Sequence, residues 1–194
     1  MIYYRVSGAI LAGGKSSRLG RPKQFLEIEG KRLIDKQVEL FMSMFRETIV
    51  VCKAVSPFLD QPCTIVKDII EHSSPLAGIY TGLKSCRGSG IFVAACDMPY
   101  LKKELIEQIL VYSEDYDVVV PQLSTGFEPL HAFYSKNCLS WIEKLFEEQS
   151  FRIYDLYKKI RAKHIVEEDL LKIDPTLNSF TNINTEEDLN KLKS

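Results

Sequence analysis

The sequence of 194 residues predicts an α/β fold with a largely parallel central sheet that helices cover on both faces. The first observation is that short apolar runs alternate along the chain with amphipathic stretches, as in repeated βα units. The second is that the runs at residues 6–11 and 91–95 are apolar along nearly their whole length, which indicates strands buried on both faces. Since no repeat, low-complexity tract or linker interrupts the pattern, residues 1–194 are expected to form one domain.

The first third of the chain predicts a strand, a loop and a helix, followed by two more strands. Residues 6–11 form a buried strand, and residues 12–20 form a loop that is rich in glycine and serine. Residues 47–52 form a β-branched strand, and residues 64–66 form a shorter one. Between the loop and these strands lies an amphipathic helix. Its apolar side chains are Ile34, Val38, Phe41, Met42 and Phe45.

The middle of the chain continues the same alternation. After a loop at residues 71–74, Pro75 occupies a favoured first-turn position of a helix that extends to residue 83. Residues 91–95 form the next buried strand, and residues 117–120 form a further one. A helix is expected between these two strands. Its apolar face consists of Leu101, Leu105, Ile109 and Tyr112.

The last part of the chain predicts one strand between two helices. The strand is expected at residues 162–166. Thr185 to Asp188 has the pattern of a capping box, so a terminal helix is expected to begin there and to continue through Leu192. The earlier helix shows an apolar face formed by Cys138, Ile142, Leu145 and Phe146.

Composition excludes several classes of protein. The 25 Lys+Arg and 26 Asp+Glu give a net charge of −1, which lacks the basic excess of a protein whose main partner is nucleic acid. No apolar run approaches the roughly 18–20 residues of a spanning helix, and no signal peptide is present, so a cytoplasmic location is expected. The five cysteines form no CxxC pair, which predicts reduced thiols rather than a zinc site or a disulfide framework.

Residues 11–20, with the sequence LAGGKSSRLG, follow the first strand directly. Glycines there let the backbone approach a ligand closely, and consecutive N–H groups can bind an anion. Lys15, Arg18 and Lys23 add positive charge within a few residues. A plain turn is the alternative, but three glycines after a buried strand, beside these basic residues, favour a phosphate-binding loop.

A P-loop is a further alternative for this segment. Residues 9–16 almost match the pattern GxxxxGK[ST], with Ala9 at the first glycine position. However, Ile10 and Leu11 still belong to the predicted strand, which leaves the loop too short to wrap phosphates. Pro22 then interrupts the helix that must follow a P-loop. These features argue against a P-loop ATPase or GTPase.

The same loop resembles the nucleotidyltransferase signature LAGGxSxRxGxxK. The matching residues are Leu11, Ala12, Gly13, Gly14, Ser16, Arg18, Gly20 and Lys23. This resemblance implies a Rossmann-like, three-layer α/β/α fold that binds a nucleoside triphosphate beside a mostly parallel sheet. It also implies that the enzyme transfers the nucleotidyl group and releases pyrophosphate.

Four later segments resemble the molybdenum cofactor guanylyltransferases, the molybdopterin-guanine dinucleotide biosynthesis protein A family. They are residues 74–79 (SPLAGI), 95–100 (ACDMPY), 128–134 (EPLHAFY) and 180–189 (FTNINTEEDL). In that family, GMP from GTP is joined to the phosphate of molybdopterin, which gives the guanine dinucleotide cofactor. The resemblance therefore implies GTP and molybdopterin as substrates, Mg²⁺ as cofactor, and transient contact with cofactor-biosynthesis or acceptor proteins.

Two features depart from the pattern of that family. Ser74 stands where the family has glycine. Residues 22–26, PKQFL, resemble the cytidylyltransferases of isoprenoid synthesis, so a CTP-dependent enzyme acting on a sugar- or polyol-phosphate is an alternative. A non-catalytic GTP-binding or GTP-sensing subunit is another alternative, although Asp97 and Lys23 together favour an enzyme. The later motifs favour GTP over CTP.

Asp97 is the main candidate metal ligand. It follows the predicted strand at residues 91–95, and Pro99 prevents a helix from forming directly after it. Because the carboxyl ends of parallel strands border the ligand crevice, its carboxylate is expected to face the triphosphate and to hold Mg²⁺. Capping of the following helix is the alternative role.

The resemblance assigns roles to the other site residues. Arg18 and Lys23 act in catalysis with Asp97, because they neutralise the triphosphate and the departing pyrophosphate. Asn182 and Asn184 lie on the pterin side, with turn and capping roles as the alternative. Nucleotide binding is expected from Leu11, Ala12, Gly13, Gly14, Ser16, Lys23, Asp68 and Asp97.

Two histidines occur close to these motifs. A phosphate monoester acceptor has a second pKa of about 6, so at neutral pH it is largely a dianion and needs no general base. His72 and His131 are therefore predicted to have structural or surface roles.

Overall fold

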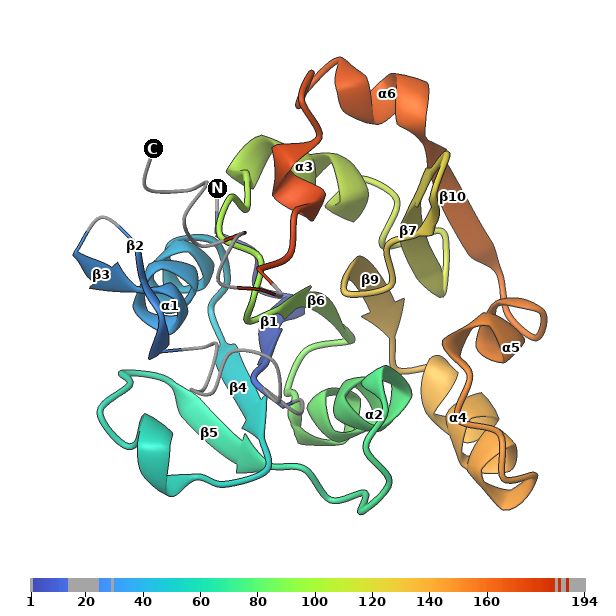
Figure 1. Ribbon diagram of the computed structural model, residues 1–194. Coiled ribbons are helices and arrows are strands. Elements are labelled where there is room, and N and C mark those ends of the chain that lie inside the picture. Colours follow the sequence, from blue (N-terminus) through green and yellow to red (C-terminus); the bar gives the residue numbers. More distant parts are fainter. Residues whose placement is uncertain (1, 14–24, 29, 184, 186–187, 189–194) are drawn as a thin grey trace.

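A computed structural model of the protein describes residues 2–13, 25–28, 30–183, 185 and 188. A mixed sheet forms its centre, and helices lie on both faces of that sheet (Figure 1). In spatial order the strands are β10 (Ala162–Val166), β7 (Val118–Leu123), β9 (His131–Ser135), β6 (Gly90–Ala95), β1 (Val6–Leu11), β4 (Thr48–Cys52) and β5 (Thr64–Lys67). A short strand, β8 (Gly126–Phe127), pairs with β7, and β2 (Glu27–Ile28) pairs with β3 (Lys31–Arg32) in a separate hairpin.

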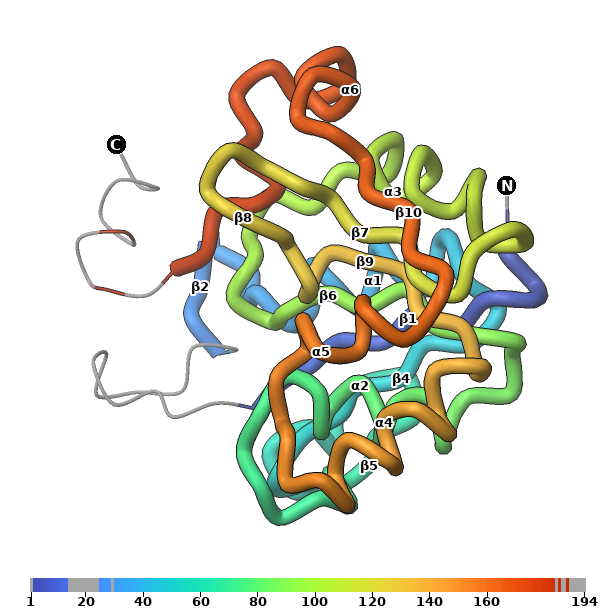
Figure 2. The backbone as a smooth tube through the Cα atoms, turned by 90° about the vertical axis from the view of Figure 1, so that its right-hand side faces the viewer, coloured from blue at the N-terminus to red at the C-terminus, as the bar shows by residue number. Residues whose placement is uncertain are grey.

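Two hydrophobic clusters divide the helices between the two faces. On one face, α1 (Leu33–Met44), α3 (Lys103–Leu110) and α6 (Glu167–Leu171) pack against side chains such as Ile10 and Phe92. On the other face, α2 (Pro75–Ser85), α4 (Cys138–Glu147) and α5 (Ile153–Tyr157) pack against Ala9 and Val93. Figure 2 shows these three layers from the side. The predicted three-layer α/β/α arrangement is therefore confirmed.

Burial on both faces explains why the strands are apolar along their length. Every residue of β1 and β6 is buried, and successive side chains point to opposite clusters. Burial of each apolar side chain stabilises the fold by about 1.5–3 kcal/mol, before the opposing chain entropy is counted. A strand with one polar face would lose this contribution on one side of the sheet.

The parallel strands bring four carboxyl ends to one edge of the sheet. β1 pairs in parallel with both β4 and β6, and β4 pairs in parallel with β5. We call this edge the carboxyl edge; it comprises residues 11–13, 52–53, 67–68 and 95–97. The opposite end, with residues 5–6, 47–48 and 89–90, is called the amino edge.

The prediction of a largely parallel sheet is correct for the core strands, and the sequence analysis misses β9. This strand is antiparallel to both β6 and β7, and it contains His131 and its neighbours from the EPLHAFY segment. Direction in a sheet depends on pairing with distant strands, so the five-residue run HAFYS does not reveal it. The short elements β2, β3, β8, α5 and α6 are also absent from the predictions, for lack of a periodic pattern.

The prediction that Met42 lies on the buried face of α1 is wrong. Met42 is 45% exposed, whereas Met44 is fully buried with Ile34, Val38 and Phe41. Eight residues at 100° each place Met42 about 80° away from Ile34 around the helix axis, which is enough to leave the apolar face.

At the end of the chain, the capping box forms as predicted. Thr185 N donates to a carboxylate oxygen of Asp188 at 2.9 Å, and Asp188 N donates to Thr185 Oγ1 at 3.1 Å. The predicted terminal helix beyond this box lies outside the described residues.

Two expectations from the composition concern reduced cysteines and membrane-spanning segments. All five cysteines are free thiols, and Cys63 is the one that is not fully buried. Among the helices of the described segments, none combines the length and the apolarity that crossing a membrane requires.

Candidate active site

The glycine-rich loop begins at the carboxyl edge, where β1 ends. Leu11 O accepts a hydrogen bond from Cys96 N at 3.1 Å, and Ala12 N donates to Val51 O at 2.8 Å. The chain is thus fixed between its two neighbouring strands as far as Ala12. A Cβ atom added at Gly13 would have no group of the described residues within 4 Å. Such a glycine leaves room for a ligand to approach the backbone closely.

Helix α2 begins at the same edge and packs tightly against β1. Its N-cap is Ser74, whose Oγ accepts a hydrogen bond from Ala77 N at 3.2 Å, and Pro75 follows at a favoured position. The serine that departs from the family pattern therefore has a capping role here. A Cβ at Gly78 would lie 3.0 Å from Leu11 Cδ1, so this glycine permits the close helix–strand contact. The positive end of the helix dipole favours anions at this edge.

Asp68 is anchored where β5 ends. Its backbone N donates to Cys52 O at 2.8 Å, which continues the ladder between β4 and β5 by one residue. Its Oδ1 accepts hydrogen bonds from Thr81 Oγ1 at 2.7 Å and from Ile70 N at 3.1 Å. Burial, reinforced by the charge of Asp68, raises the pKa of the Cys52 thiol to about 11. Asp68 is thus a half-buried, oriented carboxylate rather than a freely solvated one.

Asp97 lies in the turn that follows β6 and is half-buried. Its carbonyl oxygen accepts a hydrogen bond from Ile183 N at 2.9 Å. This contact brings Asn182, which directly precedes Ile183, next to the Asp97 turn although 85 residues separate the two in sequence. The FTNIN segment and the ACDMPY segment therefore lie next to each other, while the pterin-side role of Asn182 stays a prediction.

An ion pair between the buried Asp174 and the partly exposed Lys102 ties the same two segments together farther from the edge. Asp174 is completely buried, and it accepts hydrogen bonds from Lys102 Nζ at 2.7 Å and from Ser179 N at 2.8 Å. Burial alone would raise the pKa of Asp174, but these hydrogen bonds outweigh it and lower the pKa. Since Lys102 follows the Asp97 turn and Ser179 precedes Asn182, the pair fixes both segments.

The structure brings Leu11, Ala12, Gly13, Asp68, Asp97 and Asn182 to one edge of the sheet. The remaining predicted residues lie outside the described part of the chain, and their roles stay predictions. These are Gly14, Ser16, Arg18, Lys23 and Asn184.

The two histidines have the structural surroundings that were predicted. His131 is fully buried between the rings of Phe92 and Phe180, and burial lowers its pKa to about 3. It is therefore neutral at physiological pH. His72 is exposed and stacks on Phe151, with 3.7 Å between the ring centroids.

The sequence analysis missed Gln37, because no motif includes it. Gln37 is a buried residue of α1, and its side-chain amide contacts the turn that carries Asp97. One signal could have revealed it, namely a polar residue at position 37 on the apolar face that includes Ile34 and Phe41.

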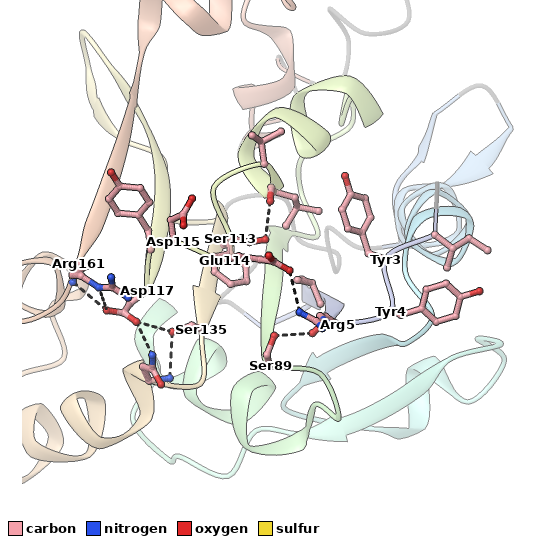
Figure 3. A pocket seen from close by; sticks show the side chains of 17 residues that line it. Tyr3, Tyr4, Arg5, Ser89, Ser113, Glu114, Asp115, Asp117, Ser135 and Arg161 are labelled. Atoms are coloured by element: carbon pink, nitrogen blue, oxygen red, sulfur yellow. Dashed lines mark hydrogen bonds and ion pairs between the residues drawn. The ribbon is translucent and has the colours of Figure 1, made fainter.

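A large cavity lies at the amino edge, away from these residues. It has a volume of about 770 Å³, and four of its charged side chains form two ion pairs (Figure 3). Arg5 Nη1 lies 3.2 Å from Glu114 Oε1, and Asp117 accepts a hydrogen bond from Asn137 Nδ2 at 2.8 Å. Arg161 Nε also lies 3.7 Å from Asp117 Oδ2. None of the predicted site residues in the described segments lines this cavity.

Known proteins resemble this chain over nearly its whole length. A molybdenum cofactor guanylyltransferase from Desulfosudis oleivorans is 37% identical over 191 residues, which cover 97% of this chain and 95% of that protein. A probable molybdenum cofactor guanylyltransferase from Natranaerobius thermophilus is 34% identical, covering 97% of this chain and 95% of the relative.

Solved structures confirm the fold. Molybdopterin-guanine dinucleotide biosynthesis protein A from Archaeoglobus fulgidus superimposes with a TM-score of 0.84 and 27% identity, covering 96% of each chain. 2-C-methyl-D-erythritol 4-phosphate cytidylyltransferase from Thermus thermophilus superimposes with a TM-score of 0.71, covering 97% of each chain. Its identity of 13% shows a shared fold alone.

A family model settles the classification. The model described as "MobA-like NTP transferase domain" matches residues 8–165, which include the glycine-rich loop and the Asp97 turn. Together with the full-length relatives, this match accounts for both the sequence motifs and the arrangement of the carboxyl edge. The chain belongs to the MobA-like NTP transferase family.

Proposed function

We propose that the protein transfers GMP from GTP to the phosphate of molybdopterin, which forms the guanine dinucleotide cofactor and releases pyrophosphate. The observation that carries the proposal is the convergence of Gly13, Asp68, Asp97 and Asn182 at the carboxyl edge. Three of these residues come from separate motifs and Asp68 follows β5, and the relatives that share nearly the full length of the chain are guanylyltransferases.

The reaction is an in-line displacement at the α-phosphorus of GTP. A phosphate oxygen of molybdopterin forms the new bond to the α-phosphorus, while the bond from that phosphorus to the bridging oxygen breaks. Pyrophosphate leaves with the electron pair of the broken bond. The acceptor phosphate is largely a dianion at neutral pH, because its second pKa is about 6, so no residue has to remove a proton from it.

The protein contributes positioning and electrostatics. The backbone at Gly13 and the N-terminal end of α2 hold the anionic triphosphate, while Arg18 and Lys23 neutralise the charge that develops on pyrophosphate. Asp68 binds the nucleoside through the carboxylate that Thr81 orients. Asn182 lies on the pterin side of the same crevice, with Asn184.

The donor set at the carboxyl edge fits a magnesium ion. Mg²⁺ binds one or two carboxylates together with substrate phosphates, and it does not need an all-protein cage. Asp97 supplies such a carboxylate, and the described residues contain no cluster of three or more acidic, histidine or cysteine side chains that would favour a different metal. When bound, the ion would neutralise the triphosphate; Asp97 would hold it.

We further propose that residues 1–194 act as one catalytic domain, with GTP and molybdopterin side by side in one crevice. Cofactor-biosynthesis or acceptor proteins would contact that crevice transiently to deliver the pterin or to receive the product.

A thermal-shift panel with GTP, CTP, ATP and UTP, each with and without Mg²⁺, tests this function. We expect GTP with Mg²⁺ to raise the melting temperature most, and pyrophosphate to be released once molybdopterin is added. Selective stabilisation by CTP would instead support the cytidylyltransferase that residues 22–26 suggest. GTP binding without pyrophosphate release, in the presence of the pterin, would support a non-catalytic GTP-binding subunit.

A further inference from the structure

The side chain of Gln37 reaches from α1 to the turn that carries Asp97. Gln37 is 3% exposed, and its Nε2 donates hydrogen bonds to Ala95 O at 2.8 Å and to Met98 O at 2.9 Å. These two carbonyl groups bracket Asp97 on both sides. One amide group therefore uses both of its hydrogens to hold the two ends of a single turn.

Other backbone hydrogen bonds of the turn connect it to β1 and to the C-terminal segment, and Cys96 N donates to Leu11 O at 3.1 Å. Within the turn, Met98 N donates to Ala95 O at 3.3 Å, a long bond for a backbone pair. From the opposite side, Ile183 N donates to Asp97 O at 2.9 Å. The Asp97 backbone is thus held by the C-terminal segment at its own carbonyl and by α1 at the flanking carbonyls. Without Gln37, the flanking carbonyls would lose their contact with α1.

Gln37 is also an unfavourable residue for its position. It lies on the apolar face of α1, with Ile34, Val38 and Phe41. Its Oε1 is buried and has no hydrogen-bond partner among the residues that the structure describes. An unsatisfied buried oxygen destabilises the fold, so an apolar side chain would pack better here. The two hydrogen bonds to the turn offset that loss. Their acceptors, Ala95 O and Met98 O, lie before and after Asp97 in the turn.

We propose that Gln37 is a positioning residue that fixes the Asp97 turn so that the Asp97 carboxylate meets the metal-bound triphosphate. This inference rests on the proposed function, in which Asp97 holds Mg²⁺ beside GTP. Groups that orient a metal ligand through hydrogen bonds change metal affinity or activity by about 10- to 100-fold when they are removed. Gln37 acts through the backbone of the turn and has no contact with substrate in this role.

The test compares Gln37→Met with Gln61→Met. Gln61 is the matched control because it is also buried and its Oε1 also lacks a partner among the described residues. Its Nε2 donates to Asp35 Oδ1 at 2.8 Å, away from the Asp97 turn. GTP binding is measured by calorimetry over a series of Mg²⁺ concentrations, and kcat and KM are measured with molybdopterin as acceptor.

For Gln37→Met, we expect the Mg²⁺ concentration at half-maximal GTP binding to rise about tenfold or more, with a lower kcat that excess Mg²⁺ partly restores. The control variant should keep the magnesium dependence of the wild type. If the magnesium dependence of Gln37→Met is unchanged, the positioning role of Gln37 is overturned. GTP binding by the wild type would still support the proposed function in that case. If the wild type itself fails to bind GTP, the proposed function fails instead.

A second variant covers the case in which Gln37→Met does not fold. Gln37→His keeps a ring N–H that can reach one of the two carbonyls, so we expect a magnesium dependence between those of the wild type and Gln37→Met. If neither variant gives a folded protein by circular dichroism, Gln37 serves the stability of the fold, and the positioning role is rejected.

Discussion

The two edges of the same sheet differ in how their polar groups are used. At the amino edge, charged side chains pair with one another, as Arg5 does with Glu114 and as Arg161 does with Asp117. At the carboxyl edge, hydrogen bonds instead orient single predicted site residues and the turn that carries one of them. Thr81 orients Asp68 there, and Gln37 brackets the Asp97 turn.

Glycines show the same difference. At the amino edge, a Cβ at Gly88 would lie 2.5 Å from Arg5 O, and a Cβ at Gly90 would overlap Tyr134 O. These glycines permit close packing of backbones. A Cβ at Gly13, on the carboxyl edge, would meet no atom of the described segments within 4 Å. Glycine therefore permits tight backbone packing at the amino edge and leaves the backbone accessible at the carboxyl edge. A glycine in the sequence does not by itself indicate a ligand site.

The largest expected effect is on turnover, and it should be confined to the carboxyl edge. Asp97→Asn removes the negative charge that would hold Mg²⁺, so we expect kcat for GMP transfer to fall by roughly 100- to 1,000-fold. Asp115→Asn makes the same chemical change on an exposed residue that lines the amino-edge cavity, and it should leave kcat unchanged. Steady-state pyrophosphate release measures both. Equal losses in the two variants would contradict the functional difference between the edges.

The next effect separates packing from ligand access. Gly90→Ala forces a methyl group against Tyr134 O, so we expect the free energy of unfolding to fall by about 1–3 kcal/mol. Gly13→Ala should leave the free energy of unfolding unchanged, because the added methyl group meets none of the described residues within 4 Å, and it should weaken GTP binding. Urea unfolding and calorimetric titration with GTP check the two outcomes. A destabilised Gly13→Ala variant would show that this glycine is also required for packing.

The last effect is gradual and concerns acid stability near the carboxyl edge. His131 is the first residue of β9, opposite Ala94, and burial lowers its pKa to about 3 in the folded protein. An unfolded histidine has a pKa of about 6.5, so below that pH the unfolded state binds a proton that the folded state does not. The free energy of unfolding should therefore fall by up to about 1.4 kcal/mol per pH unit as the pH drops from about 6.5 towards 3.

Urea unfolding of the wild type and of His131→Leu at pH 7, 6 and 5 measures this term. The variant has no group at position 131 that can bind a proton, so its stability should depend less on pH in this range. Parallel curves for the two proteins would mean that acid sensitivity arises elsewhere, for instance from the carboxylates of the amino edge.

The periodic elements could be predicted from the sequence because local burial determines them. The strands at β1, β4 and β6 are apolar on both faces, and α3 has apolar residues at helical spacing, so their patterns do not depend on distant partners. β9 could not be predicted as antiparallel, since its direction follows from pairing with β6 and β7. For the same reason, the contact between Ile183 and Asp97 is invisible in the sequence.

By itself, the sequence determined the α/β class, the family motifs and the expectation that Asp97 follows a buried strand. Hydrophobic periodicity and motif spacing are local properties, and they persist along the chain whatever the fold. Only the tertiary structure decided that Gln37 brackets the Asp97 turn and that Asp174 joins two segments of the site. Hydrogen bonds between residues far apart in sequence form only once the fold has brought the donor and acceptor atoms within about 3 Å, and no local pattern encodes that approach.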